Sequence, residues 1–244
     1  MTNHEFSNGF DTLVSSYRRF KDFDRQEILD SIEFDEYEKS FYLTKAQEEV
    51  VLSLYNGKNV YGESFELTEE LRRYLANLVY EAYLDPDISS SGYPIGVESS
   101  SRFFTLPEDL WFITYEAAHV SSNKCGNEGM MDVIPVTQDE YHKVKRNPFR
   151  GANDRRALRL DLADGVIEIV CKYDVDKYYV RYITKLSPIV LEDMPEDVSI
   201  DGIDTETSCK VHEGLHQRIL ERAVEMALRS KGIYAKENNN KTRE

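Results

Sequence analysis

Two histidines and a glutamate with the spacing of a zinc peptidase stand at the start of the last long apolar-periodic segment. They belong to the string His212-Glu213-Gly214-Leu215-His216. In a zinc peptidase, two histidines four positions apart point from one helix face at the metal, and the intervening glutamate activates a bound water. The string therefore raises the hypothesis of a zinc metallopeptidase site formed by His212, Glu213 and His216.

The surroundings of this string argue against a metal site. Cys209 and Arg218 stand where the peptidase signature has small, aliphatic or uncharged residues. Gly214 weakens the helix between the two ligands. The structured segments offer no third ligand, since Glu221 and Glu225 lie on the same expected helix. We therefore expect the string to be structural and the chain to be neither an enzyme nor a cofactor-binding protein, with the metallopeptidase kept as the alternative.

Length, composition and charge narrow the class of protein. The chain has 244 residues, 41% of them hydrophobic, which is enough for a sizeable core. No apolar run is long enough to span a bilayer, and the first residues lack the pattern of a secretory signal, so we expect no membrane partner. Three cysteines without a CxxC pair suit a reducing compartment. The net charge of −15 argues against a protein that grips the phosphates of nucleic acid.

Helical periodicity dominates the first third of the chain. It predicts helices over residues 10–20, 36–55 and 68–85, the first capped by Ser7 or Asn8 and the third by Thr68. The second helix is expected to bury Tyr37, Phe41, Val50, Val51 and Leu54. The third is expected to bury Leu71, Tyr74, Leu75, Leu78, Val79 and Ala82, and to end before Pro86, because the residue before a proline avoids the helical region.

Beyond a loop rich in serine and glycine, the pattern changes to strands. We expect strands over residues 110–120, 130–136, 158–162, 166–171 and 178–184. The sequence Ala163-Asp164-Gly165 predicts a tight hairpin turn between two of them. A capping-box pattern from Thr137 predicts a short helix to about Arg146.

The longest apolar stripe lies near the C-terminus and predicts an amphipathic helix that ends at Lys231 and Gly232. Its members are Leu215, Ile219, Leu220, Ala223, Val224, Ala227 and Leu228. A turn is expected before it at Asp201-Gly202. The predicted fold class is α+β, a helical bundle of N-terminal helices plus this helix, with an antiparallel β-rich middle part. The expected parts are a helical part at 1–90, a β-rich part at 91–205, a C-terminal helix at 206–232 packing back on the bundle, and a flexible polar tail at 233–244.

Several strings, taken together, resemble structural proteins of crAss-like bacteriophages, specifically the ring or adaptor protein that joins the portal to the tail. The strings are LPEDLWFITYEAAHV at 106–120, VIPVTQDEYHKVKRNPFRG at 133–151, RRALRLDLADGVIEIVCKY at 155–173, VRYITKLSPIVLED at 180–193 and HQRILERAVEMAL at 216–228. The resemblance implies a virion structural protein of the tail or neck, made in the host bacterial cytoplasm. It implies a ring of twelve copies that contacts the portal and other tail ring proteins, and through which genomic DNA passes without specific binding. The family has no enzymatic residues to transfer.

The same resemblance implies where the portal is bound, because adaptors of short-tailed phages dock through the C-terminal helix and tail. The docking residues expected here are Leu228, Arg229, Ile233, Tyr234 and Lys236. Since the chain carries 45 Asp and Glu against 30 Lys and Arg, we also expect the wall of the channel to be acidic or neutral. Residues 192–204 and 85–98 are the candidates for loops that face the DNA.

Overall fold

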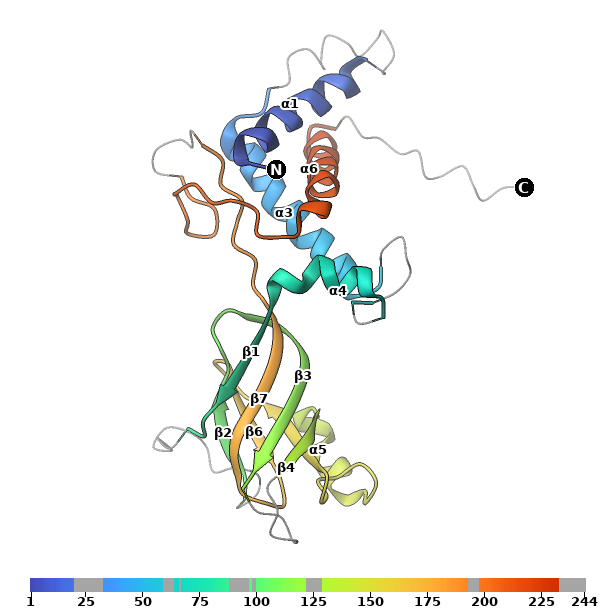
Figure 1. The fold of residues 1–244 in the computed structure, drawn as a ribbon, viewed down its shortest axis with the longest axis vertical. Helices are drawn as coiled ribbons and strands as arrows, with labels where there is room; N and C mark the ends of the chain where they lie inside the picture. The colour runs from blue at the N-terminus through green and yellow to red at the C-terminus, as the bar shows by residue number, and fades with distance from the viewer. Residues whose placement is uncertain are drawn as a thin grey trace, which may run out of the picture. The chain divides into compact units, whose positions relative to one another are not determined.

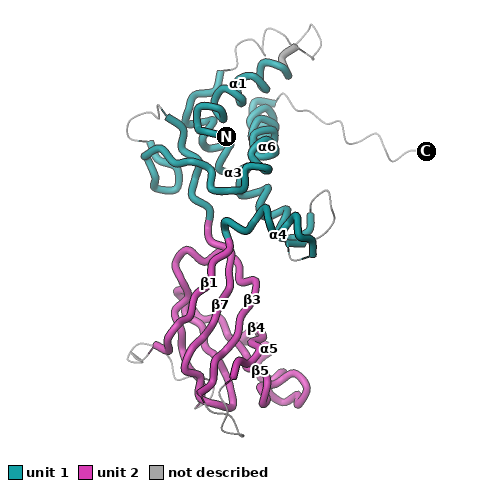
Figure 2. Tube along the Cα trace, viewed as in Figure 1, with its two compact units in different colours: residues 1–78, 186–244 teal, residues 79–185 magenta. Residues whose placement is uncertain are grey.

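The chain folds into two compact units, which Figure 2 shows in different colours. The computed structural model describes residues 1–19, 33–58, 64–65, 67–87, 97, 100–121, 129–192 and 198–232. Residues 1–78 and 186–244 form one unit, the helical unit, and residues 79–185 form the other, the sheet unit. The sheet unit is thus inserted into the sequence of the helical unit. The α+β class is confirmed, and the units divide at residues 78 and 185, where the sequence patterns suggested 90 and 205.

The described part of the helical unit is built from four α-helices and two short 3₁₀ turns (Figure 1). The helices are α1 (Asn3–Arg19), α3 (Glu36–Tyr55), α4 (Glu69–Leu75) and α6 (His216–Ser230), and the turns are η2 (Ala76–Leu78) and η3 (Glu213–Leu215). Helix α3 has the predicted bounds, because Asp35 caps it by accepting a hydrogen bond from the backbone N–H of Glu38. None of the described helices is both long and apolar enough to cross a membrane.

Helix α1 begins seven residues earlier than predicted, so the expected caps Ser7 and Asn8 lie inside it. The start is a capping box: the Thr2 hydroxyl accepts from the Glu5 N–H at 3.2 Å, and the Glu5 carboxylate accepts from the Thr2 N–H at 2.7 Å. The extra turn is stable because it buries Phe6 on the same face as the predicted core residue Phe10.

Helix α6 packs its apolar stripe against α3 and α1, as predicted. All seven residues of the predicted stripe are buried, together with Leu43, Ala46, Val50, Val51 and Leu54 of α3 and Phe6, Phe10 and Val14 of α1. Burial of one face on each helix supplies the apolar area that stabilises this unit.

A polar face of α3 is also buried, which the apolar spacing did not predict. Ser40, Thr44 and Gln47 contact the extended segment 187–191: the Ser40 hydroxyl accepts from Leu191 N–H at 3.0 Å, and the Thr44 hydroxyl accepts from Ile189 N–H at 3.0 Å. The Gln47 amide donates to the Ser187 carbonyl at 2.9 Å. Because this face is the covered one, the prediction that Phe41 is buried is wrong, and Phe41 is 40% exposed.

The predicted third helix is also wrong in its second half. Helix α4 and η2 end at Leu78, and residues 79–84 form strand β1 (Val79–Leu84). The strand pairs with β7 (Val175–Thr184) from Val79 opposite Ile183 to Leu84 opposite Tyr178. The β-branched and aromatic residues of this segment suit a strand, and a partner far along the chain overrides the helical periodicity.

The described part of the sheet unit forms a sheet of seven strands in the order β1-β7-β3-β4-β5-β6-β2. The remaining strands are β2 (Arg102–Thr105), β3 (Leu110–Val120), β4 (Gly129–Pro135), β5 (Arg156–Asp161) and β6 (Val166–Val170), with helix α5 (Gln138–Arg146) between β4 and β5. The strand and helix predictions are confirmed to within a few residues. Asp164 and Gly165 both have positive φ, as the predicted β5–β6 hairpin turn requires. Pairing is antiparallel except between β4 and β5, which are parallel because α5 carries the chain back across the sheet.

The two faces of this sheet are covered differently. The inner face holds an apolar core that includes Phe104, Ala118, Ile169, Val180 and Tyr182. On the outer face of β5 and β6, helix α5 buries Tyr141 and Val144 against Leu158, Leu160 and Val170. No helix described in this unit packs on the outer face of β1, β7 and β3, where several tyrosines lie.

Candidate functional site

The histidine string does not form the helical pair that a zinc peptidase needs. His212 lies before the helix, with extended backbone angles of φ −54° and ψ 136°, and its Nδ1 accepts from the Gly214 N–H at 3.1 Å to cap the turn η3. Its ring also packs on Tyr74, with ring centroids 5.5 Å apart. Since only His216 belongs to α6, the two imidazoles do not project from one helix face.

His216 is a buried structural residue. Its Nε2–H donates to the Val211 carbonyl at 2.9 Å, so Nδ1 is the acceptor, and this nitrogen lies 2.7 Å from the Met1 amine. Its ring stacks at a tilt on Phe6 and is 6% exposed. Burial lowers the pKa of His216, which keeps the imidazole neutral. Both ring nitrogens are therefore used by the fold.

A metal centre does not fit the described part of the chain. No group of three or more His, Cys, Asp or Glu side chains is placed there to hold a metal ion. Glu213, the supposed catalytic base, lies in the first turn of η3, beside two histidines that are both engaged in hydrogen bonds within the fold. The arrangement gives no support to the metallopeptidase hypothesis.

The expected docking residues fall into two groups. Leu228 is buried in the helical unit, whereas Arg229 is exposed and its guanidinium lies 2.5 Å from the Glu225 carboxylate. Ile233, Tyr234 and Lys236 lie outside the described residues, as does most of the candidate loop 85–98. Of the candidate loop 192–204, the described part contains the predicted turn at residues 201–202, flanked by an antiparallel bridge.

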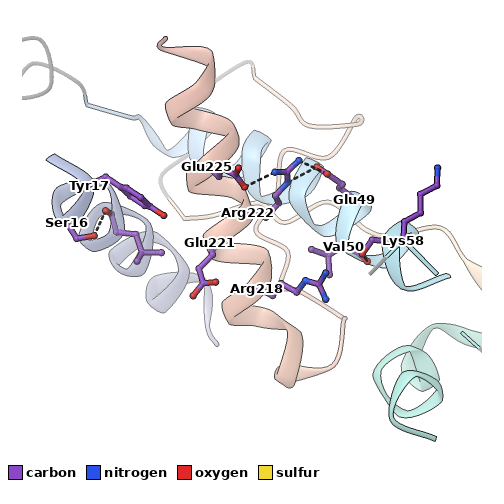
Figure 3. Close-up of a pocket in the computed structure, with 11 residues that line it drawn as sticks. Ser16, Tyr17, Glu49, Val50, Lys58, Arg218, Glu221, Arg222 and Glu225 are labelled. Carbon is purple, nitrogen blue, oxygen red and sulfur yellow. Dashed lines mark hydrogen bonds and ion pairs between the residues drawn. The ribbon is translucent and has the colours of Figure 1, made fainter. Parts of the chain in front are cut away.

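A groove of about 670 Å³ runs along α6 between α1 and α3 (Figure 3). Its centre is Arg222, whose guanidinium bonds to both oxygens of Glu49 at 2.9 and 2.5 Å and to Glu225 at 2.7 Å. Tyr17 and Val50 contribute apolar surface to the lining. These hydrogen bonds tie α6 to α3, and the paired charges leave Arg222 no role as a free cation.

The sheet unit presents three exposed or half-buried tyrosines on the outer face of β1, β7 and β3. Tyr83 and Tyr115 are 64% and 47% exposed, and both rings lie against Tyr179, at centroid distances of 4.9 and 5.9 Å. Glu81 lies on the same face, because strand residues two apart share a face. Burial and this carboxylate, which also bonds to the phenol, raise the pKa of Tyr179. We call Glu81, Tyr83, Tyr115 and Tyr179 the tyrosine face.

A second feature of the sheet unit is an exposed phenylalanine among basic residues, between α5 and β5. Phe149 is 84% exposed. Its N–H donates to the Asn147 side chain at 2.9 Å, and its carbonyl accepts from Arg156 at 2.7 Å. A side chain at Gly151 would come within 3.1–3.2 Å of three backbone oxygens, so the loop is tightly folded. Exposed cations near it in the sequence include Lys143, Arg146, Arg150 and Arg155. We call Phe149 with these four residues the basic knob.

Neither surface was predicted from the sequence. The basic knob had a detectable signal, since its cations follow each other within residues 143–155 of a chain whose net charge is −15. The tyrosine face had none, because its members come from three strands that only the sheet brings together.

The amino-acid sequence is similar, over nearly its whole length, to known phage proteins. The profile of the family described as phage tail ring protein 3/4 matches residues 1–239. The chain is 44% identical over 234 residues to "Ring protein 3" of Bacteroides phage crAss001, covering 95% of this chain and 96% of that one. It is 26% identical over 238 residues to "Ring protein 4/5" of the same phage, covering 93% and 92%. The resemblance to ring proteins of crAss-like phages is confirmed.

Proposed function

From the premise that the chain belongs to the phage tail ring protein 3/4 family, we propose that it forms a ring that attaches the tail to the portal vertex and lets genomic DNA pass. The coarser statement, a structural ring protein of a crAss-like phage particle, follows from the family itself. The observation that carries the proposal is the extent of the similarity, which spans both units and nearly the whole chain.

The partners in this proposal are further copies of the chain, the portal and other tail ring proteins. A closed ring arises when one patch of a protomer binds a different patch of the next, repeated around an axis. Twelve copies is the number we propose, to match the portal. The protein is made in the host bacterial cytoplasm and acts in the tail or neck of the virion.

Passage of DNA agrees with the charge of the chain. An array of inward-facing cations repeated around a ring holds phosphates tightly, because each contact releases counterions. The net charge of −15 favours instead a channel wall that is acidic or neutral and that repels phosphates within about 8–10 Å, roughly one Debye length. Residues 85–98 and 192–204 remain our candidates for this wall.

Docking on the portal is assigned to the end of α6 and the residues after it. Arg229, Ile233, Tyr234 and Lys236 are proposed to contact the portal. Leu228 is buried and holds the end of the helix in place for this contact.

Electron microscopy of the purified chain mixed with its portal protein tests the proposal. We expect rings of twelve copies seated on the portal, with a channel lined mainly by carboxylates or neutral groups. A chain truncated after Gly232 should fold but fail to seat. A chain that stays monomeric beside its portal would contradict the ring, and a lumen lined by Lys and Arg would contradict the acidic wall.

A further inference from the structure

Strand β7 lies between two strands that each have one side without a pairing strand. β1 pairs with β7 over all of Val79–Leu84, and no strand in the described chain pairs with its far side. β3 pairs with β7 along its length, but β4 pairs only with residues 117–120 of β3. Among the described residues, the segment 110–116 of β3 therefore has no ladder partner on the side away from β7. We call the far side of β1 the β1 edge, and the far side of residues 110–116 the β3 edge.

Hydrogen bonds to β3 fix the direction of the backbone groups of β7. The Lys185 N–H donates to the Asp109 carbonyl at 2.7 Å, and the Arg181 carbonyl accepts from the Thr114 hydroxyl at 3.0 Å. In an antiparallel ladder, the N–H and C=O of one residue point to the same side, and those of the next residue point to the opposite side. The odd-numbered residues of β7 therefore face β3, and the even-numbered residues face β1.

The same alternation identifies the polar backbone groups of the β1 edge. The even-numbered residues of β1 pair with even-numbered residues of β7, so they bond to β7. Val79, Glu81 and Tyr83 consequently direct their N–H and C=O groups away from β7. Asp87, which follows β1 with the same parity, donates on this side to the Phe103 carbonyl at 2.8 Å. Such a row of outward-facing groups is a template for another strand.

The β3 edge borders on open space. Ile113 and Glu116 pair with even-numbered residues of β7, so their N–H and C=O groups point toward the side of β4. A cavity of about 290 Å³ lies there, and its lining is Ile113, Thr114, Tyr115, Glu116, Asp132 and Val133. The pairing of β3 with β7 also shifts register twice before residue 116. Bulges of this kind bend an edge, so that a strand must match its twist to pair with it.

The two edges lie at the same height on either side of β7. Residues 79–82 of β1 and residues 112–116 of β3 pair with the same segment of β7, residues 180–183. A closed ring has no rise from one copy to the next, so segments that join neighbouring copies must lie at one height. β1 and β3 also run in the same direction, since both are antiparallel to β7.

These edges fit one another in neighbouring copies. We propose that the β1 edge of one copy pairs in parallel with the β3 edge of the next copy, so that the β1-β7-β3 ribbons form one continuous sheet around the ring. The inference rests on the proposed ring function and names the contact that closes the ring. The pair is parallel because neighbours in a ring differ by a small rotation, which keeps the strand direction. Backbone hydrogen bonds supply the affinity of such strand addition, and side chains add specificity.

The side chains at the two edges agree with this alignment. Tyr80 of β1 and Ile113 of β3 pair with the same residue of β7, so they lie side by side between copies when the edges meet at one height. Tyr80 is 51% exposed in the single chain. Pairing covers it with a β-branched neighbour, which is a favourable combination across strands. Glu81 and Tyr115 form the next such pair, since both are opposite Arg181.

Assembly of full-length variants tests the backbone contact. Glu81→Pro removes an N–H that faces outward and places the proline ring against the incoming strand, while the hydrogen bonds to β7 remain. It should raise the protein concentration needed for half-maximal ring formation at least tenfold, measured by sedimentation and electron microscopy with the portal present. Glu81→Ala removes the side chain but keeps the N–H, so this matched control should assemble like the unchanged chain. Amide exchange of the sheet unit verifies that both variants are folded.

A disulfide trap tests the alignment without a proline. The full chain carries Glu81→Cys and Tyr115→Cys together, with Cys125 and Cys209 replaced by serine. Within one copy, β7 separates the two positions by about 10 Å, whereas a disulfide needs Cα atoms within about 7 Å. Mild oxidation should therefore join neighbouring copies and give a ladder of covalent oligomers on a denaturing gel. Met130→Cys in place of Tyr115→Cys is the control and should give no ladder, because Met130 is an exposed residue of β4.

Three results would overturn the inference. The first is assembly of Glu81→Pro at the same concentration as Glu81→Ala. The second is the absence of a ladder from the chain with both Glu81→Cys and Tyr115→Cys. The third is efficient covalent dimerisation of Glu81→Cys alone, which assigns the β1 edge to a two-fold contact with another β1. Normal rings in every variant remove only this contact, whereas the proposed function fails if the unchanged chain forms no ring with its portal.

Discussion

The helical unit and the sheet unit hold their buried polar groups in different ways. In the helical unit, buried side chains of α3 bind the backbone of a segment far along the chain, as when Ser40 accepts from Leu191 N–H across 151 positions. Lys39, also buried, joins Asp11 and Glu36 at 2.7 and 2.9 Å. These contacts raise the pKa of Lys39, although burial acts against its charge.

In the sheet unit, the backbone groups of the strands pair with neighbouring strands. Of its buried carboxylates, Glu168 accepts from the Val97 N–H at 2.7 Å, whereas Glu116 pairs with other buried side chains. Glu116 accepts from the Tyr178 hydroxyl at 2.6 Å and forms an ion pair with Arg159 at 2.9 Å, both on the inner face. Burial raises the pKa of the Glu116 carboxyl, while the charge of Arg159 and the bond from Tyr178 oppose the shift. Arg159 also reaches Asp161.

This contrast predicts where each unit is most sensitive to substitution. In the helical unit, individual side chains form the hydrogen bonds of a backbone segment that lies far along the chain. Many single substitutions should therefore weaken this unit moderately. The sheet unit has a backbone ladder that tolerates most changes, and one charged network whose loss leaves a buried group without its partner. Amide hydrogen exchange followed by mass spectrometry reports on each unit separately, and serves for the four predictions that follow.

The largest effect is expected at the charged network. Arg159→Ala leaves Glu116 buried without its cation, and removing one partner of a buried pair costs about 3–5 kcal/mol. Exchange protection of the sheet unit should fall accordingly, with the helical unit unchanged. Arg102→Ala, which breaks the exposed ion pair with Asp174, should cost no more than about 1 kcal/mol. Equal costs for the two variants would remove the contrast between buried and exposed pairs.

The next effect concerns the apolar stripe of α6. Leu220→Ala removes a side chain that is buried between helices and should cost the helical unit about 2–5 kcal/mol. Leu67→Ala, at an exposed position of the same unit, is the control and should change little. A loss below about 0.5 kcal/mol would mean that α6 does not depend on packing at this position.

A moderate effect is expected at a buried hydrogen bond between a side chain and the backbone. Ser40→Ala leaves the Leu191 N–H buried without an acceptor, which costs about 1–3 kcal/mol. Ser16→Ala is the matched change, since the Ser16 hydroxyl donates to the Leu13 carbonyl of its own helix and lies nearer the surface. If both substitutions are neutral, the helical unit does not depend on these bonds and the comparison with the sheet unit fails.

The smallest effect is a pH dependence confined to the helical unit. Burial lowers the pKa of His216 below its ordinary 6.5, so the unfolded chain takes up a proton that the folded unit refuses. Stability should therefore fall as the pH drops below 6.5 toward the folded pKa, by at most about 1.4 kcal/mol per pH unit. His216→Gln should flatten this part of the profile, whereas His4→Gln, at an exposed position, should not. An unchanged profile in His216→Gln would assign the dependence to another group.

Much of the fold was predictable where a segment carries its own signal. Helix α3 and the stripe of α6 follow from apolar spacing, and the β5–β6 hairpin follows from Asp164-Gly165, because local preferences and one-sided burial agree there. The family was predictable as well, from strings distributed over most of the chain. The helical cap at Thr2 was missed, although Thr2 and Glu5 have the spacing of a capping box.

By itself, the amino-acid sequence determined the elements with strong periodicity, the acidic charge and the membership of the ring protein family. Tertiary structure alone decided that residues 79–84 pair as a strand, that the polar face of α3 is buried, and that His216 serves the fold. It also brought Tyr83, Tyr115 and Tyr179 together from three strands. The physical reason is that a local pattern specifies which face of a segment is apolar, whereas its partner, often more than 100 positions away, decides what that face meets.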